Sequence, residues 1–359
     1  MKTARALVAG AALLLASAHA GQAQSFTSTL FASGSAVSGT QPDSITIGGG
    51  HVFAEYGNGA ISNAPLGTGG SSTIAEYDTS GNAVATFSAL GSVDGLRYNP
   101  QTNLLWVLQN QDGFPALETI DPTNGLTTKY AYSNAVSTSS ARGFDDVTFV
   151  GGNAYLSYTN PAAAGDAVIY SATLANGMVN LGSPVLAYDG TASTTLNDPD
   201  SLDQTPNGSL LQTSGDDGAL TTVSNPGTAK QTVTSVSLID SVTGKNLSGL
   251  DDTVFAPSAN SSLLVADTKN NAIYKVTGPF TPGGAYSSIG STNTLDSVDL
   301  TTGLATSISS GLFPSNASPH GLGFLPAAVP EASTTVSFGL LLCFGLGGVI
   351  AKKKARLSS

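Results

Sequence analysis

The feature that most constrains this fold is a short strand-like phrase that recurs about every 50 residues. Each copy opens with Asp, or in the last case with His, followed by Ser, Gly or Asp and then by a short stretch that contains apolar residues. The copies begin at Asp43, Asp94, Asp145, Asp200, Asp251 and His320. The intervals between them are 51, 51, 55, 51 and 69 residues. A period of this length is the signature of stacked structural units, so the pattern predicts a propeller or a solenoid.

Tight turns divide each repeat into short strands. Gly and Asn follow the opening strand, as at 48–50 and 151–153, and these residues supply the positive φ that hairpins require. A later turn runs from Asp to Gly, as at 78–81 and 299–303. Four short antiparallel strands per repeat make one propeller blade. The body contains no amphipathic helical pattern, so we predict an all-β propeller of six blades, with five as the alternative.

Two further expectations follow from the closure of the propeller and from the longest interval between copies. We expect the first strand, near 26–32, to lie beside the last, at 320–325, within one blade. The 69-residue interval predicts an insertion, which we place at 277–284 because that stretch is rich in Gly and Pro.

The phrase from Leu250 to Tyr274 carries the clearest family resemblance in the body. Its opener, turn and strand ending in Val265-Ala266-Asp267 resemble the broad NHL, YncE-like and gluconolactonase-like propellers. The resemblance implies architecture and no particular chemistry, because such repeats host many functions.

The N-terminus has the three parts of a secretory signal peptide. Basic Lys2 and Arg5 precede an apolar run, and Ala18 and Ala20 fit the A-x-A cleavage pattern. The run is too short for a stable membrane span, which makes an uncleaved anchor the weaker alternative. We therefore predict a signal peptide over 1–24.

The C-terminus predicts a membrane segment followed by a cytoplasmic tail. An uncharged apolar stretch covers 336–351, close to the shortest length that spans a bilayer. The positive-inside rule keeps the basic end cytoplasmic and the body outside. That end comprises Lys352, Lys353, Lys354 and Arg356. A plain single-span anchor would explain these two features.

A short motif before the apolar stretch points to a sorting signal instead. It consists of Val329, Pro330, Glu331, Ala332, Ser333 and Thr334. Motif, helix and basic end resemble the PEP-CTERM signal of Gram-negative bacteria, with Ala332 in place of the second proline. The resemblance implies an exosortase-type sorting enzyme as partner, transit through the inner membrane, and delivery to the cell surface or a biofilm matrix. The predicted domains are thus 1–24, a propeller over 25–326, and a sorting region over 327–359.

Charge and cysteine content exclude several function classes. Six of the 13 Lys and Arg and one of the 24 acidic residues lie in the two ends, so the body holds seven basic and 23 acidic residues. A nucleic-acid surface needs concentrated cations and is excluded. The single cysteine, Cys343, excludes a disulfide scaffold and a thiol redox pair.

The repeated openers are the main candidate site, because equivalent positions in a propeller surround its axis. Asp43, Asp94, Asp145, Asp200, Asp251 and His320 would form a ring at the channel. Crowded carboxylates repel unless they are protonated, hydrogen-bonded or bound to a cation, and Ca²⁺ suits such oxygen ligands better than zinc does. The alternative is that each Asp accepts backbone hydrogen bonds and is structural, with no cofactor.

The remaining candidates are weaker. His51 begins a strand, and no Ser-His-Asp arrangement is readable from spacing. The acidic stretches 198–203 and 215–218 are calcium-like but incomplete. Sugar stacking or core packing would each explain three aromatic residues: Tyr98, Trp106 and Tyr155.

The sequence therefore predicts an exported, non-catalytic binding or structural propeller, whose ligand would be a matrix polysaccharide or protein. A calcium-dependent lactonase- or lyase-like enzyme is the alternative. A third interpretation is a passive folded cargo whose acidic surface keeps it soluble, and the sequence does not separate it from the first.

Overall fold

A computed structural model of the chain describes residues 25–133, 142–188 and 196–327. These residues form 25 β-strands and one short 3₁₀ helix, η1 (Gly34–Val37), which confirms the all-β prediction. No helix among them is long and apolar enough to cross a membrane. The predicted signal peptide, sorting motif, apolar segment and basic tail lie outside the described residues.

The strands are short, as the turn spacing predicts. In chain order they are β1 (Thr27–Ser33), β2 (Pro42–Gly48), β3 (His51–Tyr56), β4 (Ser71–Tyr77), β5 (Ala83–Leu90), β6 (Val93–Asn99), β7 (Leu104–Gln109), β8 (Ala116–Asp121), β9 (Leu126–Tyr132), β10 (Phe144–Val150), β11 (Asn153–Tyr158), β12 (Ala167–Ala175), β13 (Met178–Ala187), β14 (Pro199–Gln204), β15 (Leu210–Ser214), β16 (Ala219–Ser224), β17 (Thr232–Ser237), β18 (Ile239–Asp240), β19 (Leu250–Phe255), β20 (Ser262–Asp267), β21 (Ala272–Thr277), β22 (Ala285–Ile289), β23 (Thr294–Val298), β24 (Leu304–Ser307) and β25 (Pro319–Leu325).

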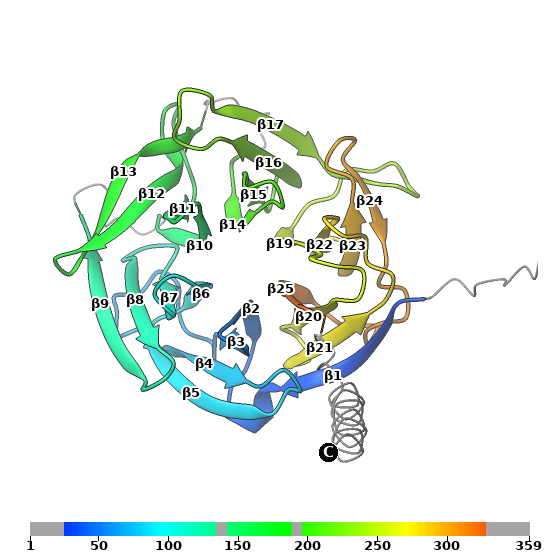
Figure 1. The fold of residues 1–359 in the computed structure, drawn as a ribbon, viewed down its shortest axis with the longest axis horizontal. Helices are drawn as coiled ribbons and strands as arrows, with labels where there is room; N and C mark the ends of the chain where they lie inside the picture. The colour runs from blue at the N-terminus through cyan, green and yellow to red at the C-terminus, as the bar shows by residue number, and fades with distance from the viewer. Residues whose placement is uncertain (1–24, 134–141, 189–195, 328–359) are drawn as a thin grey trace, which may run out of the picture.

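Antiparallel runs of four strands radiate from a common centre in a propeller-like arrangement (Figure 1). The runs are β2-β3-β4-β5, β6-β7-β8-β9, β10-β11-β12-β13, β14-β15-β16-β17, β19-β22-β23-β24 and β25-β20-β21-β1. A parallel contact between β9 and β13 merges two of them into one eight-stranded sheet, and β18 pairs with the edge strand β24. We call β2, β6, β10, β14, β19 and β25 the inner strands, because they lie nearest the centre.

The closing sheet confirms that the first and last strands belong to one sheet, which contains both β1 and β25. They are not neighbours within it, because β20 and β21 lie between them. β20 does not pair with β19, the strand that precedes it; it pairs with β25 and β21. The long interval therefore contains an additional hairpin that belongs to the closing sheet. The stretch 277–284, predicted as the insertion, is the return from β21 to β22.

Apolar side chains fill the wedges between neighbouring sheets. Trp106 is 5% exposed and meets Phe149 edge to face at 5.1 Å. Tyr155 is buried in another such cluster, and Tyr98 stacks on Phe53 at 6.2 Å. These three aromatic residues therefore pack in or against the core, which favours the packing interpretation over sugar stacking.

Candidate functional site: an acidic ring at the channel

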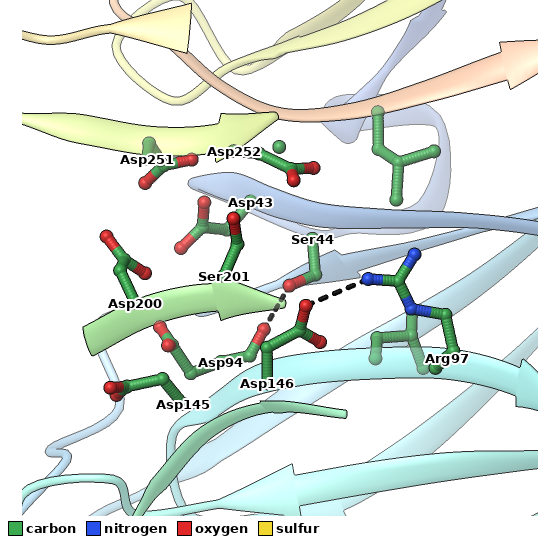
Figure 2. A pocket seen from close by; sticks show the side chains of 13 residues that line it. Asp43, Ser44, Asp94, Arg97, Asp145, Asp146, Asp200, Ser201, Asp251 and Asp252 are labelled. Atoms are coloured by element: carbon green, nitrogen blue, oxygen red, sulfur yellow. Dashed lines mark hydrogen bonds and ion pairs between the residues drawn. The ribbon is translucent and has the colours of Figure 1, made fainter. Parts of the chain in front are cut away.

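The structure places all five opener aspartates around one central cavity. Asp43, Asp94, Asp145, Asp200 and Asp251 line it, and Figure 2 shows them gathered from different strands. The cavity has a volume of ≈ 30 Å³, enough for a water molecule or two, or for an ion. His320 contacts the ring: its Nδ1 lies 3.1 Å from Asp251 Oδ1 and 3.4 Å from Asp43 Oδ1.

A bulge at the start of every inner strand brings these side chains to the channel. In β2, Pro42 pairs with Tyr56 and Ile45 with Ala54, so Asp43 and Ser44 together oppose one residue of β3. The same two-against-one shift occurs in β6, β10, β14, β19 and β25. A bulge leaves the extra residue outside the ladder and redirects its side chain.

The second bulge residue links neighbouring inner strands, a role that the sequence analysis missed. Ser44 donates a hydrogen bond to the carbonyl oxygen of Asp94 (Figure 2). Asp146 accepts from the N–H of Leu202 at 2.9 Å, and Asp252 accepts from the N–H of Leu322 at 2.9 Å. These bonds therefore join β10 to β14 and β19 to β25 through the carboxyl groups of the second bulge residues.

Arg97 is the cation that pairs with these second bulge residues, through Asp146. Its Nη2 lies 2.8 Å from Asp146 Oδ2, and its Nη1 lies 3.6 Å from Asp203 Oδ1. Its Nε and Nη2 donate to the carbonyl oxygens of Val147 and Leu202 at 2.9 and 3.0 Å. Burial opposes the charge, but the neighbouring carboxylates outweigh burial and hold the pKa of Arg97 above its ordinary value. Arg97 therefore remains charged while tying β6 to β10 and β14.

The ring of opener side chains contains more acidic groups than its one cation, His320, can neutralise. Burial, followed by repulsion from Asp43, raises the pKa of Asp94 well above its ordinary value. Burial and then neighbouring ring carboxylates do the same for Asp145 and Asp200. Attraction to Asp251 raises the pKa of His320 to about 11, so it is an imidazolium at neutral pH. The ion pairs of the described residues include none to Asp94, Asp145 or Asp200.

His320 also forms a connection that resembles a catalytic triad. Its Nε2 lies 3.3 Å from Ser318 Oγ, and its other ring nitrogen faces Asp251. A general base must have a free lone pair to take the serine proton. Because the pKa of His320 is about 11, both ring nitrogens carry protons at neutral pH. The two carboxylates beside His320 therefore favour an ion pair over proton transfer from Ser318.

The other predicted candidates occupy local structural roles. Asp198 accepts from the N–H of Asp216 at 3.0 Å, and Asp217 accepts from Ser214 Oγ at 2.6 Å. His51 lies 2.9 Å from Glu76 Oε1. Within the described ranges, one group of three metal-type ligand atoms lies within 4.8 Å of one another: Asp43, Asp251 and His320.

Comparisons with known proteins give no family for this chain. No family model and no curated protein matches it. The similar solved structures include the periplasmic gluconolactonase of Pseudomonas aeruginosa, with 12% identity over 80% of this chain and 88% of that one and a TM-score of 0.47. A virginiamycin B lyase from Staphylococcus aureus has 11% identity, coverage of 86% and 90%, and a TM-score of 0.41. A protein of unknown function from Bacteroides caccae has 12% identity, coverage of 79% and 86%, and a TM-score of 0.47.

Proposed function

We propose that the chain is an exported propeller that binds an extracellular component and performs no catalysis. The observation that carries this proposal is the size of the channel cavity, which at ≈ 30 Å³ holds a water molecule or an ion but no organic substrate. A lactonase- or lyase-like mechanism at the channel would need room for its substrate, and small-molecule sites occupy about 300–1,000 Å³. The acidic ring instead supports binding at the channel and closure of the propeller.

The proposed number of blades is six. Support comes from the inner strands, each of which opens with the same bulge and begins an antiparallel run of four strands. The contact that merges two runs joins only Met178 to Ala131 and Val179 to Tyr132. Such a short parallel contact between edge strands is compatible with two separate blades.

The proposed route is secretion, sorting by an exosortase-type enzyme and release to the cell surface or matrix. Its support is the order of signal peptide, sorting motif, apolar stretch and basic tail in the sequence. We expect the full chain, expressed in a Gram-negative host that has an exosortase, to appear at the surface or in the matrix. Replacing Pro330-Glu331 with Ala-Ala should leave it in the inner-membrane fraction, as fractionation and immunoblotting would measure. Equal surface delivery of both forms would contradict the route.

We further propose that the ring binds Ca²⁺ in a structural role. Calcium takes six to eight oxygen ligands. Asp43 and Asp251 lie within metal-ligand distance of each other, and Asp94, Asp145 and Asp200 line the same cavity. Ser201 supplies an independent indication: it is 8% exposed, lines the same cavity, and its hydroxyl has no hydrogen-bond partner. A buried hydroxyl without a partner costs about 1–3 kcal/mol, and an ion or its bound water would satisfy it.

Calcium should therefore raise the melting temperature of the protein by several degrees, since a ligand at 100 times its Kd stabilises by about 2.7 kcal/mol. The double variant Asp94→Asn, Asp200→Asn should lose most of this response, as differential scanning fluorimetry with and without EDTA would measure. The control Asp121→Asn removes an exposed acid that bonds only within its own turn, and it should retain the response. Retention of the full shift by the double variant, or no shift in the unmodified protein, would refute the calcium site.

A further inference from the structure

A second cavity is lined in part by residues of β8 and β9. Figure 1 shows that these two strands lie away from the centre of the propeller. Its volume is ≈ 610 Å³, within the range of about 300–1,000 Å³ that small-molecule sites occupy. Its apolar lining comprises Pro65, Leu66, Phe114, Pro115, Tyr130 and Tyr132. We call this cavity the rim groove.

Phe114 has an unusual backbone at the rim groove. Its φ is 54°, and every other non-glycine residue with positive φ in the described ranges is Asn, Ser or Gln. An apolar side chain in this conformation costs about 1–3 kcal/mol. Even so, Phe114 is 38% exposed rather than buried in the core. Asn110, four residues earlier, donates to the carbonyl oxygen of Ala64 at 2.9 Å and so fixes this turn against the loop that carries Leu66. The chain thus holds an aromatic ring at the surface at an energetic cost.

The polar groups of the rim groove favour an anionic ligand with hydrogen-bonding groups. Lys129 is exposed and lines the groove, whereas no Asp or Glu does, although the body carries 23 acidic residues. The nearest acid in register, Glu118 on β8, is 1% exposed and lies outside the lining. The buried Tyr132 hydroxyl has no hydrogen-bond partner. A ligand that supplied an acceptor would remove the cost of that buried donor.

We propose that the rim groove binds an acidic pyranose unit of a polysaccharide. Phe114 packs against the apolar face of the sugar ring, Lys129 pairs with its carboxylate, and the Tyr132 hydroxyl donates a hydrogen bond. Aromatic faces provide large apolar contacts, and a charged pair gives a strong hydrogen bond. This inference rests on the proposed extracellular binding function and assigns that function a site and a ligand class.

The test measures binding of the purified full chain to polygalacturonate, a polymer of uronic acid, by affinity electrophoresis at low salt. Dextran serves as the neutral comparison. Phe114→Gly removes the ring, and glycine accepts positive φ, so the fold should keep or gain thermal stability. Lys129→Gln removes the charge. We expect each variant to weaken binding at least about fivefold. The control Lys230→Gln, at an exposed turn elsewhere, should bind as the unmodified chain does.

The outcomes separate the two proposals. Binding of polygalacturonate with loss in both groove variants but not in the control would support the site. Equal binding by all variants would overturn the rim groove and leave the extracellular binding function intact. Equal affinity for dextran would overturn the acidic ligand class. If the unmodified chain binds neither polymer while it retains a different matrix component, the groove assignment fails and the binding function stands; retention of nothing would overturn both.

Discussion

Replacing Arg97 with Met will lower the free energy of unfolding by about 3–5 kcal/mol, the cost typical of leaving a buried charge without its partner. The Arg97 side chain is 18% exposed, and the Asp146 side chain is 11% exposed. Methionine preserves most of the length and apolar contact, so the loss isolates the guanidinium. Without it, Asp146 and Asp203 face each other beneath an already acidic ring. Urea denaturation followed by tryptophan fluorescence would measure the change.

Two further variants sharpen this result. Arg142→Met breaks an ion pair at 3.0 Å in which both side chains are 25% exposed, and it should cost less than about 1 kcal/mol. Arg97→Lys keeps the charge but cannot reach Asp146, Val147 and Leu202 with one planar group, so we expect an intermediate loss. If Arg97→Met costs no more than Arg142→Met, Arg97 does not hold the inner strands together.

The local regularities of the sequence predicted the ring well. Asp43, Asp94 and Asp145 are each 51 residues apart, and turn residues between them fix four strands per interval. Because each repeat contains the same number of strands, equivalent residues of the repeats reach equivalent places around the axis. For this reason the aspartates could be assigned to a common channel without knowledge of the strand pairing.

The features that the sequence did not reveal depend on long-range pairing. A bulge is defined by the strand opposite, so the roles of Ser44, Asp146 and Asp252 could not be read from their own strands. The hairpin of β20 and β21 has the same local pattern whether it pairs with β19 or with β25. The pairing of this hairpin with β25 and β1 in the closing sheet is what excludes pairing with β19. The conformation of Phe114 contradicts its local propensity, and no sequence pattern indicates it.

Stability should fall as the pH rises from about 5 to 8, the reverse of what buried, well-paired carboxylates produce. Burial raises the pKa of Asp252 to about 7, and burial with mutual repulsion raises those of Asp94, Asp145 and Asp200. A carboxyl whose pKa is higher in the folded state binds its proton more tightly when folded. Its contribution is complete below the unfolded pKa of about 3.9 and is lost as the pH rises through the folded value.

His320 changes stability in the same direction but at higher pH. Its pKa is raised to about 11, so its contribution is complete below about 6.5 and disappears as the pH rises through 11. The pKa values of four aspartates at surface turns are lowered because they accept turn hydrogen bonds: Asp78, Asp121, Asp240 and Asp299. Their contributions are lost only in stronger acid. Together these groups place the pH of maximum stability near 4–5, above the titration of the turn aspartates and below the titration of the ring carboxyls and His320.

Urea midpoints at pH 5 and pH 8, both measured in EDTA, test this prediction. Each pKa unit is worth about 1.4 kcal/mol, so the ring should contribute a difference of a few kcal/mol in favour of pH 5. Asp94→Asn with Asp200→Asn should reduce the dependence, because amides do not titrate, while Asp145 and Asp252 keep a part of it. Asp121→Asn should leave it unchanged. A higher midpoint at pH 8 in EDTA would show that the ring carboxylates are ionised and stabilised in the folded protein by protein groups alone. Calcium, in contrast, should narrow the gap by raising the pH 8 midpoint, since the cation can replace the protons that the ring has released.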